Sequence, residues 1–111
     1  MYTDKKQWYH ALEESLGLEQ SDLDDLATIL LETLPEALNA LEQAQAPKDD
    51  LQRHAHTIKG SAGNLGLIQL SKFADELEIL VLKGGAATPE YRNKLLAIQT
   101  EFAAFTRLMK S

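Results

Sequence analysis

Apolar side chains recur at the spacing of helix turns along nearly the whole chain, and no segment alternates in the manner of a β-strand. This spacing places the apolar residues of each segment on one face of a helix. Five such segments follow one another, separated by short stretches with glycine, proline or polar residues. The pattern therefore predicts an all-α fold.

The first predicted helix covers about residues 4–16. Thr3 is a suitable N-terminal cap, and Gly17 is a suitable end because glycine tolerates the left-handed backbone of a helix terminus. Its apolar stripe consists of Trp8, Leu12 and Tyr9.

The second predicted helix begins after Ser21, which with Asp24 resembles a capping box, and continues to about Gln45. Pro35 interrupts this stretch, and a proline inside a helix removes one backbone hydrogen bond and usually kinks it. The apolar stripe keeps its phase across the proline, so one kinked helix is predicted rather than two. The stripe consists of Leu23, Leu26, Ala27, Leu30, Leu34, Ala37, Leu38 and Leu41.

Three more helices are predicted in the rest of the chain. The third covers about residues 48–65 and stops at Gly66, and the fourth follows within a few residues and ends at Gly84. Thr88 with Pro89 marks the start of the last helix, which runs to near the C-terminus. Sizeable amphipathic helices joined by short loops pack as antiparallel neighbours. We therefore expect an antiparallel up-down four-helix bundle with a short additional N-terminal helix, formed by residues 1–111 as a single domain.

Composition narrows the class of protein. The chain has no cysteine, which excludes disulfides and thiolate zinc sites, and no apolar run of the length that crosses a membrane. Its net charge of −6 argues against nucleic acid as a partner, because phosphate backbones favour basic surfaces. We expect a cytoplasmic monomer that binds neither nucleic acid nor a membrane.

The candidate chemistry lies in the third predicted helix. His56, Lys59, Gly60 and Gly63 occupy positions that share one helix face at about 100° per residue. A helix built only for packing has no reason to carry two interior glycines, each of which costs about 1 kcal/mol relative to alanine. The apolar residues of this helix lie on other faces, so His56 is expected to be accessible. Those apolar residues are Leu51, Ala55, Ile58, Ala62 and Leu65.

This face suits phosphoryl transfer. Imidazole is a good nucleophile near neutral pH. Lys59 brings a flexible cation to the oxygens of a transferring phosphoryl group, where catalysis is mostly positioning and electrostatic stabilisation. Gly60 and Gly63 leave the surface free for a donor. An exposed histidine alone is most often an ordinary surface residue, but the combination H-x-x-K-G-x-x-G is far less expected by chance.

The segment resembles the signature of histidine-containing phosphotransfer (HPt) domains, which reads roughly H-x-L/I-K-G-S/A/G-S/A-x-x-L/I/F-G. The resemblance extends to the length of the chain, to Pro35 in the second helix and to the pair Leu77-Glu78 in the fourth. The residues that match the signature are His56, Ile58, Lys59, Gly60, Ser61, Ala62, Leu65 and Gly66.

The resemblance implies that His56 accepts a phosphoryl group from a receiver-domain phospho-aspartate and passes it to another receiver. Such a carrier is not an enzyme in the usual sense and has no ATP site or cofactor of its own, with Mg²⁺ supplied by the receiver. The resemblance further implies that Glu78 hydrogen-bonds the inner imidazole nitrogen of His56. The alternative interpretation of Glu78 is a solvated residue in the acidic stretch with Asp75 and Glu76.

Three other interpretations stay open or are set aside. The chain could be the phosphotransfer segment of a larger chemotaxis-type histidine kinase, phosphorylated by an ATP-binding domain. It could also be a helical module that only docks a receiver, although such a module does not need His56. A metal pair of His54 and His56 is disfavoured, because these side chains diverge by about 200° around the helix. His54 and His10 are interpreted as surface or packing residues.

Overall fold

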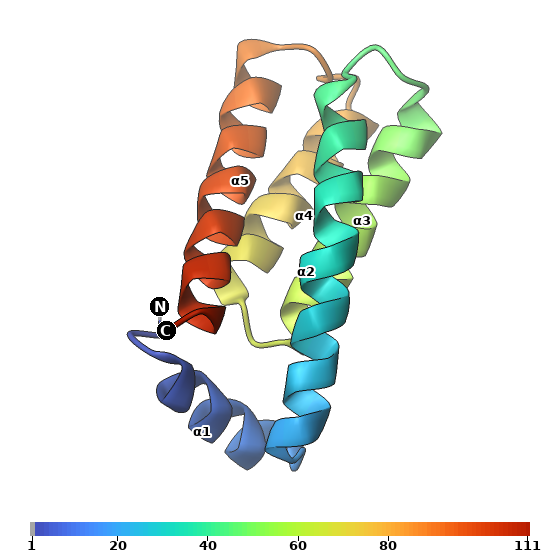
Figure 1. Cartoon of the computed structure of the whole chain (residues 1–111). Helices are drawn as coiled ribbons and strands as arrows, with labels where there is room; N and C mark the ends of the chain where they lie inside the picture. The colour runs from blue at the N-terminus through green and yellow to red at the C-terminus, as the bar shows by residue number, and fades with distance from the viewer. Residues whose placement is uncertain (1) are drawn as a thin grey trace.

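The computed structural model describes residues 2–111, which form five helices. In α2–α5 each helix packs against two others, α2 and α4 both lying against α3 and α5 (Figure 1). Helix α1 crosses one end of this bundle. The predicted all-α bundle with an extra N-terminal helix is confirmed. The helices are α1 (Lys5–Leu16), α2 (Gln20–Glu42), α3 (Lys48–Asn64), α4 (Ile68–Leu82) and α5 (Pro89–Met109).

The predicted N-terminal cap of α1 is wrong by one residue. Asp4 takes the cap position, and its carboxylate accepts a hydrogen bond from the backbone N–H of Gln7 at 2.9 Å. Thr3 instead donates its backbone N–H and its hydroxyl to the side chain of Gln7. A carboxylate is the stronger acceptor at a helix N-terminus because it also interacts favourably with the helix dipole.

The start of α2 differs from its prediction in the same way. Glu19 is the cap and forms a capping box with Asp22, whereas Ser21 and Asp24 were the predicted pair. The box has the expected spacing but begins two residues earlier, again with an acidic residue as the cap. A carboxylate near the predicted position therefore determines where each of the first two helices begins.

Two of the other helix ends follow the sequence pattern. Gly66 has a φ of 68° and ends α3, and Thr88 caps α5 by accepting the N–H of Tyr91. Helix α2 passes through Pro35 as one helix, as predicted, but ends at Glu42, before the predicted end at residue 45.

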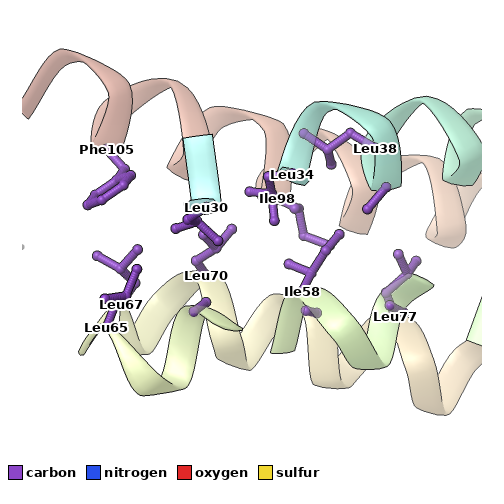
Figure 2. Packing of buried hydrophobic residues seen from close by; sticks show 14 of the residues in the cluster. Leu30, Leu34, Leu38, Ile58, Leu65, Leu67, Leu70, Leu77, Ile98 and Phe105 are labelled. Carbon is purple, nitrogen blue, oxygen red and sulfur yellow. The ribbon is translucent and has the colours of Figure 1, made fainter. Parts of the chain in front are cut away.

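The apolar core lies between the four long helices. Figure 2 shows Leu34, Ile58 and Ile98 converging from α2, α3 and α5. Within residues 2–111 every buried side-chain N or O atom has a hydrogen-bond partner. One predicted core residue is misplaced: Leu26 is 37% exposed. The helix buries Ala27 and the rest of the predicted stripe, which leaves Leu26 at the margin of the buried face.

Helix α1 is fixed to the bundle at the turn between α3 and α4. Trp8 is fully buried, its indole N–H donates to the Leu65 carbonyl at 3.0 Å, and its ring packs edge-on against Phe105. The hydroxyl of Tyr2 donates to the carbonyl of Gly66 at 3.2 Å. These contacts hold in place the turn that follows the helix carrying His56.

The buried Tyr91 gives a test of the bundle's other end. Its hydroxyl donates to the Leu41 carbonyl at 2.5 Å, and burial raises the pKa of Tyr91 to about 12. Because a free tyrosine has a pKa of about 10, the folded state gains full stability from this group below pH 10 and loses it as the pH rises toward 12. Tyr91→Phe should cost about 1 kcal/mol at pH 7 and flatten this alkaline loss. Urea unfolding at pH 7 and about pH 11 measures the free energy of unfolding of both proteins. An equal loss of stability between these pH values in variant and parent would contradict the prediction.

Candidate functional site

His56 lies on α3 with its side chain 64% exposed, on the side of that helix that borders α4. The apolar residues of α3 turn the other way and are buried in the core. This orientation follows from the spacing of those residues, because burying their stripe leaves the His56 face at the surface. The buried residues of α3 are Leu51, Ala55, Ile58 and Ala62.

Glu78 of α4 contacts the inner nitrogen of His56. Its side chain is only 10% exposed, and its oxygens Oε2 and Oε1 lie 3.1 Å and 3.4 Å from Nδ1 of the imidazole. A carboxylate can only accept, so this contact favours the proton on Nδ1. In a neutral ring Nε2 then carries a free electron pair. Among residues 2–111, Nε2 of His56 has no hydrogen-bond partner.

Gln52, one helix turn before His56 on α3, also reaches Glu78. Its side-chain N–H donates to Oε2 at 2.5 Å. The carboxylate is therefore held from two sides by residues of α3, and its orientation toward the imidazole is fixed. Sequence reasoning missed Gln52. The available signal was its spacing of four residues from His56, which places both side chains on the same helix face.

Lys59 is held by two carboxylates of α4. Its ammonium nitrogen lies 3.0 Å from Oδ1 of Asp75 and 3.6 Å from Oε1 of Glu78. The hydrogen bond and charge of Asp75, followed by the charge of Glu78, raise the pKa of Lys59 above its ordinary value. Lys59 is therefore a cation beside the imidazole. The role of Asp75 was also missed, although its spacing from Glu78 puts both carboxylates on one face of α4.

The two glycines leave the surface beside His56 without side chains. Both are exposed, and a Cβ placed on Gly60 meets nothing within 4 Å. A Cβ on Gly63 lies 3.4 Å from the hydroxyl oxygen of Ser71, which is ordinary contact. That hydroxyl donates to the backbone carbonyl of Lys59 at 2.9 Å and ties α3 to α4. Of these two glycines, Gly60 therefore leaves more open space at the surface beside His56.

The remaining histidines and the acidic residues were candidates for a metal site. Within residues 2–111, His, Asp and Glu side chains do not gather in any group of three or more that could hold a metal ion. His10 lies on α1, where it contacts Glu14 at 3.2 Å. No helix in the same range is both long and apolar enough to cross a membrane.

The geometry thus presents an exposed imidazole nitrogen, a neighbouring cation and an open helix face. A family model of the Hpt domain matches residues 25–107. The chain therefore belongs to the Hpt domain family, whose function is histidine phosphotransfer in two-component signalling. Hpt domains are carriers of phosphoryl groups rather than catalysts, and they interact with receiver domains of response regulators. Comparison with curated proteins and with solved structures gave no match.

The family match contains the whole candidate site but leaves out α1. It begins within α2 and ends within α5. Helix α1 therefore lies outside the matched residues, and the contacts of Trp8 with Leu65 and of Tyr2 with Gly66 attach this part of the chain to the end of the helix that carries His56.

Proposed function

We propose that this protein is a phosphocarrier of a multistep phosphorelay. In this proposal His56 takes a phosphoryl group from a phospho-aspartate of one receiver domain and gives it to an aspartate of another. The observation that carries the proposal is the contact between Glu78 and Nδ1, which leaves the free electron pair of an exposed imidazole on Nε2. The carrier acts as a cytoplasmic monomer, and residues 1–111 form one functional domain.

The transfer step needs no proton to leave the imidazole. The electron pair of Nε2 forms a bond to phosphorus while the bond from phosphorus to the aspartyl oxygen breaks, and the released carboxylate keeps that electron pair. The ring becomes positively charged, and the Glu78 carboxylate lies against its protonated Nδ1. Passing the phosphoryl group on reverses these steps and restores the neutral ring.

The neighbouring residues have supporting roles in this proposal. Lys59 stabilises charge on the phosphoryl oxygens, and Gly60 with Gly63 gives the receiver room to bring its aspartate near His56. The carrier has no cofactor of its own. Mg²⁺, which neutralises charge on phosphoryl groups, comes with the receiver's site.

Lys59→Ala should slow phosphoryl acceptance by about tenfold, because the cation beside the phosphoryl oxygens is lost. Glu78→Ala should slow it less, by loosening the preference for the Nδ1 proton. Timed transfer from a ³²P-labelled receiver measures both rates. Lys94→Ala is the matched control, since that lysine pairs with Glu76 on the other side of α4 at 2.7 Å. Equal rates for Lys59→Ala and the parent would rule out the electrostatic role.

The second candidate function is the phosphotransfer segment of a chemotaxis-type kinase, in which the donor is ATP. The exposed Nε2 suits either donor, so the test compares donors directly. The protein is incubated with a panel of phosphorylated receivers from the same cell, and separately with ATP and the kinase domains of that cell. We expect acid-labile label from at least one receiver and its passage to a second. Label that appears only with ATP and a kinase domain would support the alternative.

A further inference from the structure

Lys59 is already occupied by negative charge before any phosphoryl group arrives. Its ammonium nitrogen lies between the carboxylates of Asp75 and Glu78 and is closer to Asp75. A cation in this position must give up part of its contact with these carboxylates when it turns toward the oxygens of a phosphoryl group whose phosphorus is bonded to Nε2 of His56. The strength of the contact between Lys59 and the phosphoryl oxygens therefore depends on how strongly the carboxylates hold Lys59.

The two carboxylates are not equally free to release the lysine. Glu78 is nearly buried and is held by Gln52 and His56 as well as by Lys59. The Asp75 side chain is 45% exposed, and Lys59 is its ion-pair partner across the interface between α3 and α4. An exposed carboxylate is readily solvated by water when its partner leaves, whereas a buried one is not. Asp75 is therefore the contact that Lys59 gives up.

We propose that Asp75 is a positioning residue that competes with the phosphoryl group for Lys59 and so shortens the time for which His56 stays phosphorylated. The proposal rests on the proposed function, since it concerns the phosphorylated state of the same histidine. The bound phosphoryl group carries two negative charges, and its charge falls as it departs in a loose transition state. Lys59 therefore stabilises the bound group more than the departing one. Whatever draws Lys59 away makes departure faster.

Asp75→Asn tests the competition without changing the shape of the side chain. Each protein is loaded with phosphoramidate, a small phosphoryl donor that needs no partner protein, and then desalted. The decay of the phosphohistidine is followed by ³¹P NMR. Asp75→Asn should lengthen the phosphohistidine half-life about twofold to fivefold, the range expected for one exposed ion pair. Asp75→Ser removes the same charge and should lengthen the half-life in the same way. Asp75→Glu keeps the charge and should leave the half-life close to that of the parent.

Glu76→Gln is the matched control, because it removes the same charge one residue along α4. Glu76 pairs with Lys94 of α5, away from α3, so its loss should leave the half-life unchanged. A second control places Asp75→Asn in a Lys59→Ala background, where the longer half-life should disappear. If the longer half-life persists without Lys59, Asp75 acts by repelling the phosphoryl group directly, and the proposed competition for Lys59 is wrong.

The carrier function of His56 and the role of Asp75 are contradicted by different results. If neither phosphoramidate nor any phosphorylated receiver places a phosphoryl group on His56 of the parent, the proposed carrier function itself is in error. If the parent is loaded normally and Asp75→Asn decays at the parent's rate, only the role of Asp75 is overturned. An equal change in Glu76→Gln would likewise overturn it, because the effect would then be one of overall charge.

Discussion

His56→Gln should abolish phosphoryl acceptance while leaving the melting temperature almost unchanged. Glutamine has no nucleophilic ring nitrogen, but its amide can still donate to Glu78, so the buried carboxylate keeps a partner. The replaced side chain is 64% exposed, and surface substitutions usually change stability by no more than about 0.5 kcal/mol. Loading with phosphoramidate or with a phosphorylated receiver, followed by mass spectrometry of the intact protein, measures the loss.

His54→Gln is the control for this variant, since it removes a histidine from the same helix but from a different face. It should accept a phosphoryl group at the parent's rate. Acid-labile label that persists in His56→Gln, on His54 or elsewhere, would show that the assignment of the phosphorylated residue is wrong.

Gly60→Gln should slow phosphoryl transfer strongly while leaving the protein folded. A Cβ at this position meets nothing within 4 Å, and glycine is the poorer helix former by about 1 kcal/mol, so the variant should melt at or above the parent's temperature. The longer side chain then stands where a receiver would approach His56. Transfer should fall about a hundredfold, because the reacting atoms need near-contact alignment.

Gly60→Ala provides the matched comparison, since it brings the same gain in helix propensity without the bulk. It should melt higher and transfer at close to the parent's rate. Gly63→Gln is a less clean test, because a Cβ there already touches Ser71 at 3.4 Å. A Gly60→Gln protein that is stable and transfers normally would mean that receivers do not approach over this face.

Much of the fold could be predicted from the sequence because the information is local. Five helices, the passage of α2 through Pro35 and the stop at Gly66 all follow from spacing and backbone preference. The caps at Asp4 and Glu19 were missed because several neighbouring residues can cap a helix, and sequence alone does not rank them. Leu26 is exposed because it lies at the margin of the face that α2 buries, and the width of that buried face is a property of packing.

Part of the candidate site could likewise be predicted from local spacing, and part could not. His56, Lys59 and the glycines lie on one helix, so their common face could be read from spacing. Gln52 and Asp75 were missed because each acts through a contact between α3 and α4. The acidic run of α4 does not show by itself which carboxylate faces α3 and which faces α5.

Two neighbouring acidic residues of α4 contact different helices. Asp75 pairs with Lys59 of α3, whereas Glu76 pairs with Lys94 of α5. Adjacent positions on a helix point about 100° apart, so a run of like charges can contribute to separate sites. Only the arrangement of the three helices shows which carboxylate belongs to the candidate site.

The most direct test of the phosphocarrier proposal is the position and fate of the phosphoryl group on the imidazole ring. NMR of the ¹⁵N-labelled, phosphorylated protein distinguishes the two ring nitrogens, and an unphosphorylated receiver is then added. The proposal predicts phosphate on Nε2 of His56, with the proton on Nδ1 facing Glu78, and its loss matched by an equal gain of phospho-aspartate. Phosphate on Nδ1, on another residue, or on a histidine that never gives it up to any receiver would contradict the account.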